Sequence, residues 1–303
     1  MQEKINIVLC MNSKYVMPSM VCITSVVENN KNPIDFYILY SHLEESEIKS
    51  MKNHIKKYGS QYSLIPVKID ENNNLSGPIN GRSKEAYYRL LIPTVLPKNL
   101  DRCLYIDGDI IVQKSLNEFY NMPFDNKAFI VCEDVGEILL YHKERHPILN
   151  IPLEYRYFNS GVLMFNLNYF RNNNFDINII FNYIKNNSDK LKFLDQDVLN
   201  ALFYDKVKFA YSNLYDYLEI LISHLLANDN MEKAVIVHFI QKPWKYTYNG
   251  INAKYWWKYG KKLYKFEYFK FCIINFIYRK CLGLLLLVIS INRLKKLKQA
   301  IKK

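Results

Sequence analysis

Two carboxylates separated by one glycine, Asp107-Gly108-Asp109, stand between two short apolar runs of this 303-residue chain. The runs Leu104–Ile106 and Ile110–Val112 are predicted to be buried strands, and the glycine would let the backbone turn sharply, so that both carboxylates emerge at one strand end. Oxygen ligands at that point suit a hard divalent cation that binds a diphosphate. The alternative is a simple Asp-Gly hairpin turn, which is common between alternating hydrophobic residues.

Other polar residues that could contribute to chemistry each have an ordinary structural alternative. Asp195 fits the N-cap of a predicted helix, and Asp197 fits the first turn, where the helix dipole favours an acid. The segment Asn159-Ser160-Gly161 fits a turn that leads into a strand. His238 follows an apolar run and fits a hydrogen-bonded structural histidine, while Lys242-Pro243-Trp244 fits the end of a surface loop.

The elements that must position these residues alternate along the chain. Strands are predicted at Ile5–Met11, Asp35–Tyr40, Tyr62–Ile69, Leu104–Ile106, Ala128–Cys132, Val162–Phe165 and Ala234–Val237, and helices at Met20–Asn29, Glu44–Tyr58, Arg82–Leu91 and Leu194–Tyr204. The helix at Arg82–Leu91 is expected to stop before Pro93. This alternation indicates an α/β fold with a mainly parallel central sheet. Ligands of such sheets bind beyond the carboxyl ends of strands, where Asn12, Asp107 and Asp109 stand.

Positive charge is concentrated at the end of the chain. Residues 254–303 hold fourteen Lys/Arg and one acid, a net charge of +13, so residues 1–253 carry −1 in a chain of +12. We therefore expect a catalytic domain over 1–253 and a basic extension over 254–303, and we do not expect a nucleic-acid-binding core. Six cysteines without a C-x-x-C pair, and no signal-peptide pattern, predict a cytoplasmic protein.

The basic extension mixes lysines, aromatic residues and the apolar run Cys281–Ile289, which is too short to span a bilayer. An interfacial, partly helical segment with lysines at lipid headgroups fits this composition and predicts peripheral association with the inner face of the membrane. The alternative is a last helix that packs on the core and is followed by solvated lysines.

Four motifs in order carry a resemblance to a known family. They are Asp107-Gly108-Asp109, Tyr157-Phe158-Asn159-Ser160-Gly161-Val162, Leu194-Asp195-Gln196-Asp197-Val198-Leu199-Asn200, and His238-Phe239 followed by Lys242-Pro243-Trp244. Over about residues 4–250 the chain resembles the retaining family 8 glycosyltransferases of GT-A fold, and in particular bacterial lipopolysaccharide galactosyl- and glucosyltransferases. The resemblance implies transfer of a hexose from a UDP-sugar to a hydroxyl of a glycan or lipid-linked saccharide, such as lipopolysaccharide core.

The resemblance also implies a metal site and a reaction centre. Asp107, Asp109 and His238 would bind Mn²⁺, with Mg²⁺ as the alternative, and the metal would act as a Lewis acid on the leaving diphosphate. Gln196 would lie nearest the anomeric carbon, and because an amide is a poor nucleophile we expect a front-face displacement. Asp195 would lie beside the donor sugar, and Asp197 is the acid to test for a covalent intermediate.

Further positions match residues of the family that bind the donor. They are Asn12 and Tyr15 at the uracil, and Arg89, Asp107, Gly108, Asp134, Asn159 and Lys242 around the sugar and diphosphate. The alternative for Arg89 is a pair with an acid on its own helix surface.

Two features depart from the family pattern. Asn12 replaces the more usual acid, and only Phe239-Ile240-Gln241 separate His238 from Lys242, where the family usually has a glycine and more residues. These departures leave open a catalytically inactive relative that binds membrane or polyanion, and the shared donor residues leave open a protein-glycosylating transferase.

Overall fold

The computed structural model describes residues 3–70, 77, 83–136, 142–219, 231–248 and 252–281. The chain separates into two compact units, Met1–Ile240 and Gln241–Lys303. The expected domain boundary after residue 253 stays a prediction.

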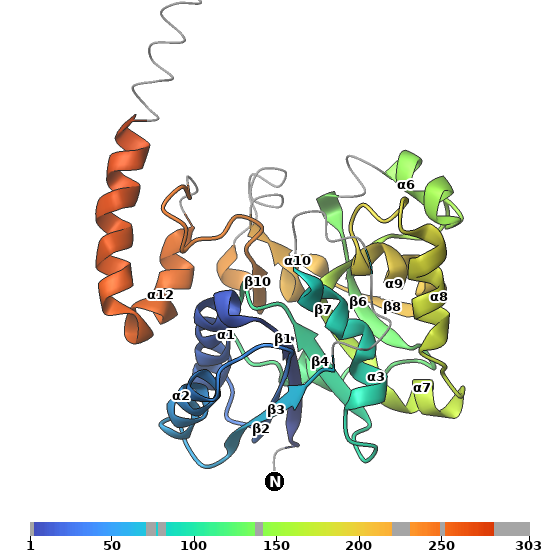
Figure 1. Cartoon of the computed structure of the whole chain (residues 1–303), viewed down its shortest axis with the longest axis horizontal. Helices are drawn as coiled ribbons and strands as arrows, with labels where there is room; N and C mark the ends of the chain where they lie inside the picture. Colours follow the sequence, from blue (N-terminus) through green and yellow to red (C-terminus); the bar gives the residue numbers. More distant parts are fainter. Residues whose placement is uncertain are drawn as a thin grey trace, which may run out of the picture. The chain divides into compact units, whose positions relative to one another are not determined.

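A seven-stranded sheet forms the centre of the first unit (Figure 1). Its order is β3-β2-β1-β4-β7-β6-β8. The strands are β1 (Ile5–Cys10), β2 (Ile34–Tyr40), β3 (Tyr62–Lys68), β4 (Arg102–Ile106), β6 (Phe129–Glu133), β7 (Phe158–Asn166) and β8 (Val207–Ala210). Four strand pairs are parallel, and only β7 runs against its two neighbours β4 and β6. The α/β class with a mainly parallel sheet is confirmed.

Helices cover both faces of this sheet because side chains of a strand alternate between faces. Ile7 and Leu9 of β1 pack in a core that includes α1 and α2, whereas Val8 packs in a second core that includes η2 and α9. The bounds are η1 (Ser13–Tyr15), α1 (Val16–Asn29), α2 (Glu45–Lys56), η2 (Lys84–Leu91), α3 (Ile92–Val95), α4 (Asn117–Tyr120), α6 (His142–Leu149), α7 (Leu167–Asn172), α8 (Asn178–Asn187), α9 (Asp195–Phe203), α10 (Ser212–Tyr215) and η3 (Met231–Lys233).

A second, three-stranded sheet joins β5 (Ile110–Val112), β10 (Ile236–His238) and β9 (Tyr217–Leu218) in the order β5-β10-β9. Strand β5 is antiparallel to β10, and β9 is parallel to it. The strands before and after Asp107-Gly108-Asp109 therefore belong to different sheets, and the hairpin alternative is wrong.

Two local expectations were also wrong. The chain remains helical past Pro93, because 3₁₀ helix η2 is followed directly by α3 with the proline in its first turn, where its missing N–H is not needed. Asn159-Ser160-Gly161 lies inside strand β7 rather than in a turn before it, since the strand begins at Phe158.

The second unit holds α12 (Ala253–Leu263) and a further helix over residues 265–281. Its core is aromatic: the rings of Trp256 and Trp257 lie 4.7 Å apart, and Trp257 lies 5.1 Å from Phe271. No helix among the described residues is long and apolar enough to cross a membrane. Of the apolar run Cys281–Ile289, residues 282–289 lie outside the described residues.

Candidate active site

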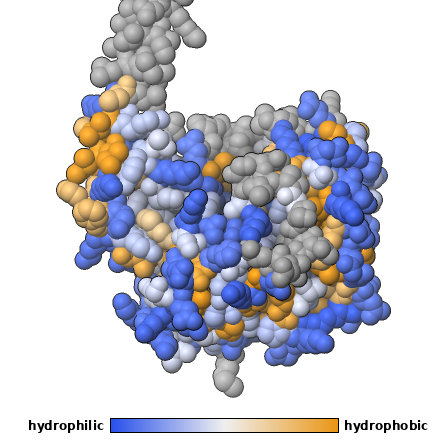
Figure 2. Space-filling model, in the orientation of Figure 1, coloured by the Kyte–Doolittle hydropathy of each residue, from blue (hydrophilic) through white to orange (hydrophobic). Residues whose placement is uncertain are grey.

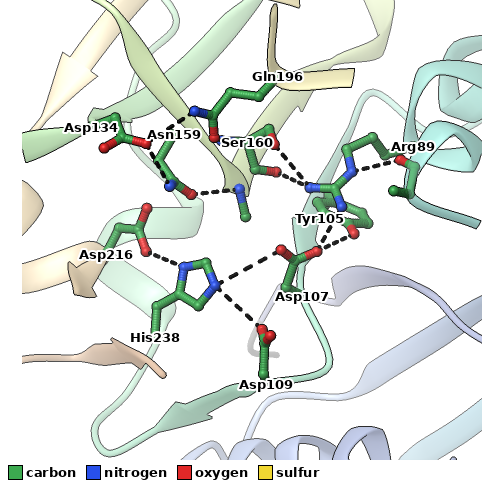
Figure 3. Close-up of polar contacts among 12 residues, drawn as sticks. Arg89, Tyr105, Asp107, Asp109, Asp134, Asn159, Ser160, Gln196, Asp216 and His238 are labelled. Carbon is green, nitrogen blue, oxygen red and sulfur yellow. Dashed lines mark hydrogen bonds and ion pairs between the residues drawn. The ribbon is translucent and has the colours of Figure 1, made fainter. Parts of the chain in front are cut away.

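Three side chains converge where the two sheets of the first unit meet. Asp107 follows β4, Asp109 precedes β5, and His238 ends β10. Nε2 of His238 lies 3.3 Å from Asp109 Oδ1 and 3.9 Å from Asp107 Oδ2 (Figure 3). One ligand atom from each residue lies within 4.8 Å of the others. Two carboxylates and an imidazole in this arrangement are a donor set that fits a divalent cation such as Mn²⁺.

Gly108 is needed for space rather than for a special backbone conformation. The chain turns at residues 108–109 as expected, but the φ of Gly108 lies outside the left-handed region, so the turn does not depend on the conformational freedom of glycine. A methyl group at this position would collide with Ser19 Oγ and lie 3.3 Å from Tyr15 Cδ1. Gly108 therefore lets the chain pass close to η1 and α1 as it leaves one sheet for the other.

Asp216 holds the opposite side of the His238 ring. Its Oδ1 lies 3.1 Å from His238 Nδ1, and its side chain is fully buried (Figure 3). The residue immediately precedes β9, whose parallel pairing with β10 sets Leu218 beside His238. An Nδ1–H donated to Asp216 fixes the tautomer that leaves Nε2 facing Asp107 and Asp109.

Protonation of His238 follows from these neighbours. Burial alone would lower the pKa of its ring, but hydrogen bonds to Asp109 and Asp216 and their charges raise it to about 10. Burial raises the pKa of Asp216, and the hydrogen bond from His238 opposes that shift. A cation held by Nε2 would take the place of the second ring proton, because a histidine that ligates a metal is the neutral imidazole.

The absence of a side chain at Gly161 leaves space for the His238 ring. Its carbonyl accepts a hydrogen bond from the Asp107 N–H at 2.9 Å, which ties β7 to the end of β4. A Cβ at Gly161 would collide with His238 Cε1 and lie 2.9 Å from Nδ1. The glycine therefore allows β7 to approach the backbone of Asp107 while the histidine approaches its carboxylate.

Arg89 links the metal-site cluster to helix α9. Its Nη2 lies 2.9 Å from Asp107 Oδ1, and its Nε lies 3.0 Å from Asp195 Oδ2. Its Nη1 donates to the Ser160 carbonyl at 2.5 Å, and Tyr105 OH donates to Asp107 Oδ1. The arginine is 6% exposed, so the alternative of a helix-surface ion pair is wrong.

A group of amides lies around Asp134, next to this network. Oδ2 of Asp134 accepts hydrogen bonds from Asn159 Nδ2 at 3.1 Å and from Gln196 Nε2 at 3.0 Å. The other end of Gln196, Oε1, accepts from the Ser160 N–H at 3.0 Å. The Gln196 amide is thereby held in one orientation, and three predicted donor-binding residues lie together.

Helix α9 does not begin as expected. Its N-cap is Leu194, with φ +55°, and Asp195 is the first helical residue, so the N-cap interpretation of Asp195 is wrong. Asp197 does lie in the first turn, but its carboxylate is fully buried. It pairs with Arg145 at 2.5 Å and accepts from Tyr157 OH at 2.8 Å and from the Phe193 N–H at 2.7 Å. These contacts favour a structural role for Asp197.

The residues predicted to bind the uracil lie at η1. Asn12 Nδ2 donates to Glu85 Oε2 at 3.1 Å, and Asn12 Oδ1 caps η1 by accepting from the Lys14 N–H. Tyr15 lies against Gly108. Lys242 belongs to the second compact unit, and its contact with the diphosphate stays a prediction.

Asp216, Glu85 and the spatial role of Gly161 were not predicted from the sequence. Asp216 precedes a strand of only two residues, too short to be recognised by alternation. Glu85 lies in the same 3₁₀ helix as Arg89, but its hydrogen bond comes from the distant Asn12, and such a long-range contact leaves no periodic signal in a single sequence.

The chain is similar to known proteins in both sequence and fold. A sequence model described as glycosyl transferase family 8 matches residues 6–248. A lipopolysaccharide 1,2-glucosyltransferase of Escherichia coli is 29% identical over 273 residues, covering 84% of this chain and 77% of that protein. A Haemophilus influenzae protein is 29% identical over 208 residues, but the match covers only 62% of its length and 68% of this chain.

Among solved structures, the galactosyltransferase LgtC in complex with donor and acceptor sugar analogues superposes with a TM-score of 0.73 at 21% identity. The match covers 86% of this chain and 96% of LgtC. At this identity the likeness establishes the shared fold.

Proposed function

This chain belongs to glycosyl transferase family 8, and we propose that it transfers a galactose or glucose from a UDP-sugar to a hydroxyl of a surface glycan such as lipopolysaccharide core. Retention of the anomeric configuration, Mn²⁺ dependence and a lipid-linked acceptor at the cytoplasmic face of the inner membrane are part of the proposal. The observation that carries it is the convergence of Asp107, Asp109 and His238 at the strand ends of a glycosyltransferase fold.

The bound metal would supply Lewis acidity at the two phosphates of the donor. Asp107, Asp109 and His238 would hold it, and the remaining residues would act on the sugar. Arg89 forms ion pairs with both Asp107 and Asp195, and these ion pairs fix the distance between the two carboxylates. This arrangement supports a preorganised donor site.

Retention would proceed on one face of the sugar. The bond from the anomeric carbon to the diphosphate breaks, and the acceptor oxygen bonds on the same face while its proton passes to the departing phosphate. Gln196 supports this route, because its amide is fixed by Ser160 and Asp134 and is a poor nucleophile. The buried pairing of Asp197 with Arg145 argues against a covalent intermediate on that acid.

Two other functions remain as rivals. A protein-glycosylating transferase would use the same donor residues and differ only in its acceptor. An inactive relative would bind membrane without consuming donor. The three intact ligand candidates Asp107, Asp109 and His238 argue against this alternative, because nothing would preserve a complete metal site in an inactive protein.

The first test is release of UDP without acceptor, over a panel of UDP-sugars with Mn²⁺ or with chelator. We expect metal-dependent hydrolysis of one donor, and a loss of about a hundred-fold or more in Asp109→Asn, since a Lewis acid at the leaving group contributes several kcal/mol. Asp205→Asn is the matched control, because this acid pairs with Lys206 on the surface.

Equal turnover by Asp109→Asn and the control would refute the metal assignment. No turnover or binding of any donor by the folded wild-type protein would favour the inactive relative.

A further inference from the structure

The helix over residues 265–281 presents two chemically different faces. On one face Tyr268, Phe271 and Asn275 pack within the second unit: the rings of Tyr268 and Phe271 lie 5.2 and 5.1 Å from Trp257. The Asn275 amide donates to the carbonyls of Tyr246 and Tyr248 at 2.7 and 2.6 Å. This packed face fixes the rotation of the helix about its own axis.

The other face exposes large apolar side chains. They are Phe266, Phe269, Ile273, Phe276 and Ile277, with exposed fractions of 73, 64, 46, 63 and 54%. At 100° per residue they fall within an arc of about 100° over about 17 Å of helix. Figure 2 shows apolar residues gathered along one side of this helix. We call these five residues the exposed aromatic face.

Basic residues border this face. Lys265 and Lys270 are exposed on its two edges, and Arg279 and Lys280 are exposed at its C-terminal end. Glu267 is the single acid between residues 254 and 303, where the net charge is +13. Because lysine side chains are long, those at the edges of the apolar stripe extend their ammonium groups away from it toward the solvent.

We propose that the exposed aromatic face is the surface by which this protein binds an anionic lipid bilayer, with the helix lying parallel to the membrane plane. Phenylalanine and isoleucine side chains would enter the acyl region, while Lys265, Lys270 and Lys280 contact phosphate headgroups. The charge decides the occupant, because a second copy would bring another +13 segment against this one, whereas anionic lipid neutralises it. The inference is independent of the sugar chemistry.

The test is co-sedimentation of the full chain with vesicles of phosphatidylglycerol and phosphatidylethanolamine, compared with vesicles of phosphatidylcholine. We expect binding to the anionic vesicles that weakens with salt. The variant Phe269→Gln/Phe276→Gln should lose about ten-fold or more in partitioning, since it removes two apolar anchors. Each of Lys265→Gln, Lys270→Gln and Lys280→Gln should lose about five-fold.

The matched control is Leu153→Gln/Ile179→Gln, which removes two apolar side chains, 58 and 52% exposed, from the first unit. It should bind vesicles like the wild type, and an unchanged thermal midpoint should show that both double variants are folded. The proposal is overturned if the wild type does not bind anionic vesicles, or if both double variants bind equally. It is also overturned if sedimentation shows a dimer that only Phe269→Gln/Phe276→Gln dissociates, with vesicle binding unchanged.

Discussion

The imidazole of His238 is held on both sides, by Asp109 at Nε2 and by Asp216 at Nδ1. The amide of Asp216→Asn could still accept from Nδ1–H, but without the charge that makes the ring a stronger ligand. We expect Asp216→Asn to weaken Mn²⁺ binding about ten- to a hundred-fold, measured by calorimetry in the presence of UDP.

Asp205→Asn serves again as the control, and Mn²⁺ should bind to it with wild-type affinity. If Asp216→Asn lowered the thermal midpoint but left Mn²⁺ affinity unchanged, Asp216 would be a core residue without a role at the metal. The measurement separates the two roles because affinity is read without turnover.

For single residues, the sequence predicted which residues belong to the site better than it predicted which of them contact one another. The Asp-Gly-Asp spacing indicated two of the metal-binding candidates and the family resemblance added His238, and the structure brings the ligand atoms of all three together. The sequence did not indicate that Arg89 joins Asp107 to Asp195, because that pairing depends on where η2 lies against the sheet. Long-range ion pairs of this kind leave no periodic signal in a single chain.

Strand β7 brings Gly161 against the His238 ring, and a side chain there has no space. We expect Gly161→Ala to displace the ring from Asp109 and to weaken Mn²⁺ binding about ten-fold or more, because a shift of about 1 Å at such a site has large effects. A double-mutant cycle with His238→Asn, read as thermal midpoints in chelator, isolates this contact.

In the cycle, the effect of Gly161→Ala should be much smaller in the His238→Asn background, where the smaller side chain leaves room. Equal effects in both backgrounds would mean that the methyl group disturbs β7 itself rather than the histidine.

Helix α9 is anchored by Asp197, whose pair with Arg145 has no access to solvent on the aspartate side. Asp197→Asn leaves Arg145 as a buried, uncompensated charge, so we expect a loss of about 3 kcal/mol in the free energy of unfolding in urea. The exposed Asp189→Asn should change it by less than about 0.5 kcal/mol. A stable Asp197→Asn protein without transferase activity would instead assign this acid to catalysis.

Strands built on apolar runs were predictable, including the three-residue β5, whereas the two-residue β9 and the way the strands pair were not. The strands β1, β2 and β3 agree with expectation to within one residue, since each is a mostly apolar segment of six or seven residues. The two-residue strand β9 and the change of sheet between β4 and β5 come from tertiary pairing alone. Yet that small sheet sets Asp109, Asp216 and His238 beside one another, so the site depends on strand pairing that no single segment of the sequence predicts.

On the scale of the whole chain, charge and chemistry are separated: the metal-binding candidates lie in a nearly neutral part and the exposed aromatic face in a strongly basic one. If both proposals hold, membrane binding should matter only when the acceptor is itself in the membrane. A soluble saccharide reaches the site by diffusion, whereas a lipid-linked saccharide is met efficiently only by protein bound to the same vesicle.

We therefore expect Phe269→Gln/Phe276→Gln to transfer sugar to a soluble acceptor at the wild-type rate, and to a lipid-linked acceptor in anionic vesicles about ten-fold more slowly, in line with its weaker partitioning. The measurement is the initial rate with each acceptor, with Leu153→Gln/Ile179→Gln as the control that should match wild type in both. Equal slowing with both acceptors would mean that the substitutions damage the catalytic unit. If the variant matched the wild-type rate with both acceptors, membrane binding would not deliver the acceptor, because a ten-fold loss of membrane-bound protein should lower the rate with the lipid-linked acceptor.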